Sequence, residues 1–523
     1  MAGGMRSKGC RTCRMRHVKC DEAKPTCQRC QKAKMECRGY TPVQMFVDEA
    51  PRILEAQAKA SAKKKLKQVT ESNQDTTLVR RCISIPSGLA MGVFSNALLM
   101  NLDLSAFAQD IYHTFLFSHL FDGPSVYNPN ILSEVAYTST SNTPSVALDA
   151  LARMYFGKMN NCQRAIEEGT KLYGTSLRQF KQDIATLTSA YSHWVLTTAM
   201  TLEIYECIAF TSTSGWLQHA GGIGALVLAR GPSRHQKAFE HNMFRSSRMI
   251  IILACLTRRQ HTFLEQEEWK TIPWALQPKS PSCYLIDILS NVPGFLADSK
   301  ALEDLRLSGA SQGLISVTRA KLTESVITQL QKLYDWRWNW ESANASTTIV
   351  ASADASRLKP APFSTILTFT NVRVANAVAV YDAVALLLLR LLSTLHPDES
   401  PFSFVAPKPP VDFCGTNPLL LPGDPMNLAE IALEICRTVD YHLWDGHSSV
   451  GAFAILFPLR IACTCLSQVY EEVKGRSSHR ISGCNLLLIR KWMREVERFI
   501  VEGNGFALGS GVFRDIGGYE VLE

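Results

Sequence analysis

Beyond about residue 85, apolar and polar positions alternate with the period of an α-helix. Apolar residues recur every three to four positions over residues 148–181, and the pattern continues over 190–207. This spacing predicts amphipathic helices with one face turned toward a core. The region holds over 400 residues, which is long enough to bury a substantial interior. Residues 85–523 are therefore expected to form a large all-α domain.

One stretch of this region, residues 374–395, is more uniformly apolar and long enough to cross a bilayer. Asn376, Asp382 and Arg390 interrupt it, and a charge in the middle of a bilayer is costly. The stretch thus predicts a buried helix, and no membrane partner is expected. Two further segments predict loops long enough to be partly disordered: the Ser/Ala/Thr-rich residues 342–362 and the proline-rich residues 397–425.

The N-terminal 40 residues follow a different pattern, because cysteines set their spacing. Two copies of Cys-x2-Cys-x6-Cys follow one another, and two residues between cysteines let one helical turn direct both thiolates at a single tetrahedral Zn²⁺. Six thiolates fill two tetrahedral sites only if two of them bridge, so the spacing predicts two Zn²⁺ ions. The predicted ligands are Cys10, Cys13, Cys20, Cys27, Cys30 and Cys37.

Two other uses of these cysteines fit less well. Disulfides belong to oxidising compartments and small secreted domains, and the segment MAGGMRSKG has no apolar stretch typical of a secretory signal. Single zinc fingers need histidines at ligand spacing, and His17, the nearest one, is wrongly placed. The binuclear cluster remains the favoured interpretation.

Charge indicates what this segment contacts. Residues 1–40 hold 11 Lys and Arg against three acidic residues, a net charge of +8 that equals the net charge of the whole chain. The remaining residues balance to zero. A small metal module that carries all the excess positive charge predicts a polyanionic partner, and nucleic acid fits best.

Residues 10–40 resemble the fungal binuclear zinc cluster transcription factors, which carry the same six cysteines. The resemblance implies that Cys10 and Cys27 bridge the two ions. It also implies a helix from about Arg11 to Val18, with a basic pair at its end that enters the major groove over a CGG triplet. Arginine can bond guanine O6 and N7 together. The expected base-reading residues are Arg16 and His17, and the expected phosphate contacts are Arg11, Arg14, Lys19, Arg29, Lys32 and Lys34.

Residues 41–84 are predicted to be a basic linker between this module, residues 1–40, and the helical domain. The run Lys63, Lys64, Lys65, Lys67 is typical of a nuclear localisation signal, although an ordinary solvated linker has the same composition. Together with the DNA-binding module, it predicts a nuclear protein. The linker has no sustained heptad pattern, so a homodimer is left open without support from this stretch.

The large domain resembles the fungal-specific transcription factor domain that often follows such a cluster. The likeness rests on Trp216-Leu217-Gln218-His219, Arg230-Gly231-Pro232 and Pro273-Trp274, and it implies an all-α regulatory domain. His219 is interpreted as a helix-packing histidine. Residues 169–176 imitate a phosphate-binding loop, but Thr175 stands where the lysine is required. No catalytic constellation is found, so an enzyme is not expected.

These observations predict a mainly α protein with a small N-terminal binuclear zinc cluster module. Its expected function is that of a nuclear, sequence-specific regulator that binds double-stranded DNA and controls genes of RNA polymerase II. Activation is the commoner role in the family that it resembles, but no acidic-hydrophobic tail marks an activation segment, so repression stays open. The helical domain would relay a signal to the transcription machinery or to co-regulators. An alternative is that the cluster is a protein-interaction scaffold and the body carries an unrecognised ligand-binding or enzymatic function.

Overall fold

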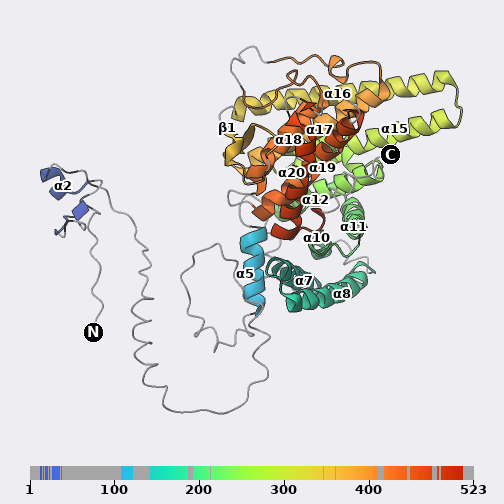
Figure 1. Cartoon of the computed structure of the whole chain (residues 1–523). Helices are drawn as coiled ribbons and strands as arrows, with labels where there is room; N and C mark the ends of the chain where they lie inside the picture. Colours follow the sequence, from blue (N-terminus) through green and yellow to red (C-terminus); the bar gives the residue numbers. More distant parts are fainter. Residues whose placement is uncertain are drawn as a thin grey trace. The chain divides into compact units, whose positions relative to one another are not determined.

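The computed structural model describes most of the large domain and part of the cysteine module. In the large domain these are residues 108–121, 142–185, 192–212, 214–344, 347–359, 361–409, 417–443, 448–473, 480–481 and 484–509. In the cysteine module they are residues 12, 13, 16, 18–21, 23, 26–33, 35 and 37. The chain divides into two compact units, of which one contains the cysteine module and the other the helical body (Figure 1). The predicted linker at 41–84 lies outside the described residues.

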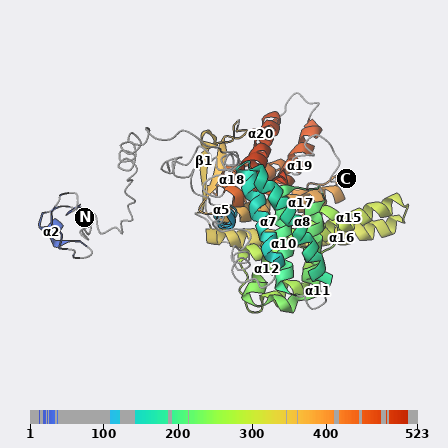
Figure 2. The same ribbon diagram turned by 90° about the horizontal axis from the view of Figure 1, so that it is seen from below.

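In the part of the chain that the structure describes, the first half of the helical body consists of helices. In chain order these are α5 (Ala108–Leu120), α7 (Asn142–Met159), α8 (Gln163–Ala185), α10 (His193–Ala209), α11 (Gly215–Arg230), η3 (Pro232–His235), α12 (Ala238–Arg258), η4 (Phe263–Glu265), α13 (Glu267–Thr271), η5 (Ile272–Trp274), α14 (Pro281–Leu289), α15 (Val292–Leu307) and α16 (Gln312–Asn344). The projecting pair formed by α15 and α16 is visible in Figure 2.

The second half adds two small hairpins to the helices. Its elements are β1 (Thr348–Ser352), η6 (Ala353–Ala355), β2 (Thr365–Phe369), α17 (Val372–Leu395), η7 (Pro401–Ser403), α18 (Leu428–Leu443), α19 (Ser448–Val473), β3 (Arg480–Ile481), β4 (Cys484–Asn485), α20 (Leu486–Arg498) and η8 (Phe499–Gly503). The mainly α fold is therefore confirmed.

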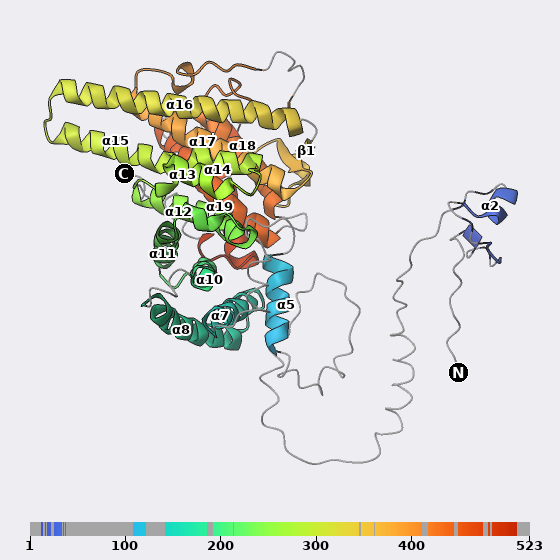
Figure 3. The same ribbon diagram turned by 180° about the vertical axis from the view of Figure 1, so that it is seen from behind.

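Helix α17 forms the centre of the core and packs against α14, α15, α16, α18 and α19 (Figure 3). It begins where the Asn371 side chain accepts hydrogen bonds from the backbone N–H groups of Arg373 and Val374, both at 3.1 Å. Two helices, Val372–Leu395 and Ser449–Glu472, are long and apolar enough to cross a membrane, but 83% and 72% of their apolar windows are buried inside the protein. The predicted buried helix is thus confirmed.

The amphipathic stretch 148–181 proves to be two helices. Helix α7 ends at Met159, the chain turns through Asn161 with a φ of 51°, and α8 starts at Gln163. The two helices pack closely at Gly169, where an added Cβ would lie 3.0 Å from the backbone nitrogen of Met154. The glycine that opens the imitation of a phosphate-binding loop therefore serves helix packing.

Two loop predictions need correction. Residues 342–362 contain the end of α16, strand β1 and η6, and β1 pairs antiparallel with β2 from Thr348↔Phe369 to Ser352↔Thr365. The strand was missed because its five residues lie in a Ser/Ala/Thr-rich context. In residues 397–425, the described part contains η7 and buries Val405, so it belongs to the folded body.

His219 lies on α11 and belongs to a hydrogen-bonded group of side chains that joins three helices. The hydroxyl group of Tyr173 on α8 lies 3.0 Å from its Nε2 atom and donates a 2.5 Å hydrogen bond to Glu206 on α10. Burial lowers the pKa of His219. These contacts agree with the predicted helix-packing role.

Candidate metal centre and nucleic-acid interface

Helix α2 (Gln28–Lys32) positions the second pair of cysteines. Cys27 caps its N-terminus, and the Cys27 Sγ atom accepts a hydrogen bond from the backbone N–H of Cys30 at 3.3 Å. Three residues span nearly one helical turn, so both sulfur atoms face the interior of the module. Cys27 and Cys30 are fully buried as a result. A helix of five residues is marginal by itself, and therefore the cysteine cluster must hold it.

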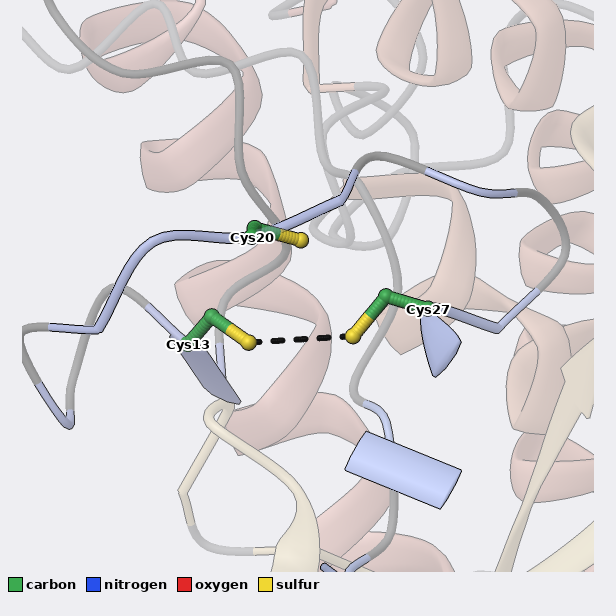
Figure 4. Close-up of side chains that lie close together, drawn as sticks. All are labelled: Cys13, Cys20 and Cys27. Carbon is green, nitrogen blue, oxygen red and sulfur yellow. Dashed lines mark hydrogen bonds between the residues drawn. The ribbon is translucent and has the colours of Figure 1, made fainter. Parts of the chain in front are cut away.

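The described cysteines gather in two groups that share one member. The sulfur atoms of Cys13, Cys20 and Cys27 lie within 4.8 Å of one another, and so do those of Cys27, Cys30 and Cys37. Figure 4 shows the first group, whose side chains come from three points along residues 13–27 and point toward a common space. Cys10 lies outside the described residues.

The distances between these sulfur atoms fit a tetrahedral zinc site. A Zn–S bond of about 2.3 Å gives a separation of about 3.8 Å between two sulfur ligands of one ion. The Sγ atoms of Cys13 and Cys27 are 3.7 Å apart. The Sγ atoms of Cys13 and Cys30 are 3.8 Å apart, although the family resemblance assigns these two cysteines to different ions. The two halves thus meet in one compact cluster.

Asp21 links the first half of the module to the second. Its carboxylate accepts hydrogen bonds from the backbone N–H groups of Gln28 at 2.9 Å and Arg29 at 3.1 Å, at the start of α2. The bond from Gln28 is the main reason that the pKa of Asp21 falls below its usual value. In return, the Arg29 guanidinium donates to the backbone oxygen of Lys19 at 3.3 Å. Sequence reasoning missed Asp21 because its partners are backbone groups seven and eight residues away.

The cations that the structure describes are on the surface of the module. Arg16, Lys19, Arg29 and Lys32 are all exposed. They are therefore accessible to a polyanion, although Arg29 already uses one donor within the module. The other predicted DNA contacts lie outside the described residues: Arg11, Arg14, His17 and Lys34.

The predicted helix from Arg11 to Val18 needs correction at its end. Thr12 and Cys13 are helical, and the backbone N–H of Arg16 donates to the oxygen of Thr12 at 3.2 Å. Val18 is outside the helix, and its N–H reaches back to the oxygen of Cys13 at 3.1 Å. This wider bond closes the end of the helical segment, and Arg16 lies within the closing turn. Arg16 thus still stands at the C-terminal end of the helical segment.

Comparison with known protein families assigns a family to each of the two units. Residues 8–45 match the family described as the fungal Zn(2)-Cys(6) binuclear cluster domain. Residues 110–402, more than half of the chain, match the family described as the fungal specific transcription factor domain. The chain therefore belongs to the fungal transcription factors that combine these two domains, and the predicted resemblance is confirmed.

Several curated fungal proteins are similar to parts of the chain. An uncharacterized protein of Emericella nidulans is 30% identical over 189 residues, which cover 35% of this chain and 40% of that protein. The aspercryptin biosynthesis cluster-specific transcription regulator of the same fungus is 55% identical over 40 residues, 8% of this chain and 7% of the regulator. Sterol uptake control protein 2 of Saccharomyces cerevisiae is 51% identical over 37 residues, 7% of this chain and 4% of that protein.

These matches span less than half of each relative's length. No solved structure matches the chain. The family membership implies zinc binding and a DNA partner, and the matching families are those of transcription factors.

Proposed function

We propose that this protein is a nuclear, sequence-specific regulator that binds CGG-like triplets in double-stranded DNA and activates genes transcribed by RNA polymerase II. The observation that carries the proposal is the convergence of the two cysteine groups on Cys27 in a module with exposed cations. Six sulfur ligands can fill two tetrahedral sites only if thiolates are shared between the two ions. Relatives whose names describe them as transcription regulators support the same function.

In this proposal the six cysteines hold two zinc ions, with Cys13 and Cys20 on one ion, Cys30 and Cys37 on the other, and Cys10 and Cys27 shared. The metal supplies the cross-links around which the module folds, since the module has no other described core. The residues of this chain then recognise the DNA. Asp21 fixes α2 against the first half, and the exposed cations contact the DNA.

Arg16 is proposed to read a guanine because it stands at the end of the helical segment and its side chain is exposed. His17 is proposed beside it. Lys19, Arg29 and Lys32 are proposed to contact phosphates, as are Arg11, Arg14 and Lys34, which positions the module without specifying sequence. The linker 41–84 would carry the nuclear signal, and the helical body would contact co-regulators or the transcription machinery.

The test compares binding of the full-length protein to a CGG-containing duplex and to a scrambled duplex. Arg16→Ala should lose about 1–3 kcal/mol of discrimination, because a bidentate contact with one base is removed. Lys32→Ala, an exposed cation on α2, should weaken both duplexes alike and reduce the slope of affinity against salt by about one counterion. Fluorescence anisotropy at several salt concentrations measures both quantities.

Two outcomes would contradict the proposal. Equal weakening of both duplexes by Arg16→Ala would remove the base-reading role from that residue. A zinc-loaded protein that does not bind DNA even at low salt would favour the alternative in which the cluster is a protein-interaction scaffold.

A further inference from the structure

A carboxyl group without a partner lies in the centre of the helical body. Asp382 is in the middle of α17, and only 2% of its surface is exposed. Its side chain makes no hydrogen bond with any residue that the structure describes, and its Oδ2 atom is completely enclosed. Burial, and secondarily the nearby Glu434, raise the pKa of Asp382 well above its usual value. An unpaired buried carboxylate is costly, so this position requires a compensating proton or cation.

Asp382 lines a small cavity between three helices and a loop. Tyr334 of α16, Tyr381 of α17, Ile431 of α18 and the loop residues 420–423 form its other walls. The cavity has a volume of about 10 Å³, which is room for one particle of the size of a water molecule. The hydroxyl groups of Tyr334 and Tyr381 also lack hydrogen-bond partners among the described residues. Three polar side chains without partners therefore line a space for one small particle.

The charged side chains around the cavity include more carboxyl groups than arginines. Arg337 on α16 is bound to Glu341, and its positive charge also favours the ionised forms of Asp382 and Glu434. Glu434 on α18 accepts hydrogen bonds from the backbone N–H of Leu420 at 3.0 and 2.9 Å. Burial raises the pKa of Glu434 to about 7.

Besides Arg337, two further charges act on Glu434, and they have opposite signs. Arg437 favours its ionised form, and Asp424 of the covering loop disfavours it. Asp382 and Glu434 are thus two carboxyl groups whose pKa values stay raised by burial although Arg337 lowers both.

We propose that this cavity binds one ammonium ion, with the Asp382 carboxylate as its counter-ion and the hydroxyl oxygens of Tyr334 and Tyr381 as further acceptors. The ion has the size of a water molecule and offers four N–H donors. Ca²⁺ and Mg²⁺ require six or more oxygen ligands, which three side chains do not supply.

Binding exchanges one cation for another. The protonated Asp382 carboxyl group loses H⁺ to solvent as the ammonium ion enters, so the charge of the cavity is unchanged. Ammonium affinity therefore rises with pH, as long as ammonium itself stays protonated. The bound ion would join α16, α17 and the loop before α18, which stabilises the helical body.

The experiment measures thermal unfolding of the full-length protein at constant ionic strength, with NaCl replaced stepwise by NH4Cl, KCl or tetramethylammonium chloride. Ammonium should raise Tm by about 1–2 °C in a saturable way, and more at pH 8 than at pH 6. Tetramethylammonium, which is too large for the cavity, should have no effect. Titration with ¹⁵N-ammonium, followed by NMR, should show a bound signal.

Asp382→Asn should abolish the ammonium response, because it removes the counter-ion with little change of shape. Asp304→Asn, an exposed change on α15, is the matched control and should keep the response. If Asp382→Asn does not fold, Tyr334→Phe removes one acceptor and should weaken the response severalfold. Equal Tm in sodium, potassium and ammonium salts would overturn the proposal, as would an ammonium response that survives in Asp382→Asn.

Discussion

The Asp21 carboxylate joins the two halves of the cysteine module at the scale of a single residue. It follows Cys20 in the first half and receives two backbone N–H groups of α2 in the second. Arg29 completes the link by donating to the backbone of Lys19. Because the described core of the module consists mainly of cysteines, these hydrogen bonds fix the orientation of α2 relative to the first half.

Asp21→Ala should therefore release zinc to a competing chelator about tenfold faster, because α2 loses both acceptors that orient its ligands. Asp21→Asn should have a smaller effect, since its amide oxygen still accepts one hydrogen bond. Gln31→Ala, an exposed change on the same helix, is the control and should resemble the wild type. Zinc transfer to a colorimetric chelator provides the rates. Equal rates for Asp21→Ala and Gln31→Ala would show that Asp21 does not position the ligands.

At the scale of elements, the contact between α7 and α8 depends on a residue without a side chain. A Cβ atom at Gly169 would lie 3.0 Å from the backbone nitrogen of Met154 and 3.1 Å from the backbone oxygen of Ala150. Backbone atoms cannot rotate away, so the two helices must separate to admit a methyl group. Gly222 on α11 is different, because an added Cβ there meets nothing within 4 Å.

We expect Gly169→Ala to destabilise the helical body by about 1–3 kcal/mol through overpacking. Gly222→Ala should instead stabilise it by about 0.5–1 kcal/mol, because alanine favours the helix and no neighbour obstructs it. Chemical unfolding of the two variants, followed by tryptophan fluorescence, measures both changes. If Gly169→Ala were as stable as Gly222→Ala, the two helices would not be held as closely as the structure shows.

The elements also show which parts of the fold the sequence predicts. Amphipathic periodicity predicts α8 because a helix of that length repeats its pattern several times. The helix expected over 190–207 forms as α10, but residues 195–208 are buried on every side, so this helix is not amphipathic. The periodicity does not locate the turn at Asn161, where the apolar spacing continues across the break. Strand β1 has only five residues and is held by pairing with β2, which no local pattern reveals. In the site, cysteine spacing indicates the ligands, whereas Asp21 and the Asp382 cavity depend on segments brought together by folding.

At the scale of the whole molecule, the two units have different sources of stability. The helical body contains a continuous apolar core that extends from α5 to α20. In the cysteine module, the described core consists of Cys13, Cys27 and Cys30, with Val18 and two further cysteines packed against them. The first 40 residues carry a charge equal to that of the whole chain, and the remainder is neutral. Apolar burial therefore stabilises the body, while the module depends on metal.

This difference predicts how the full-length protein responds to metal removal. A strong chelator should abolish DNA binding and should change the Tm of the helical body by less than about 1 °C, because that core contains no proposed metal ligand. Mild acid should act in the same direction, since protons compete with zinc for thiolates. Fluorescence anisotropy with labelled DNA measures DNA binding by the cysteine module. Circular dichroism at 222 nm measures the helicity and the Tm of the helical body. Added zinc should restore binding, and magnesium at the same concentration should not. Loss of body helicity upon chelation, or retention of DNA binding without zinc, would contradict this division of the chain.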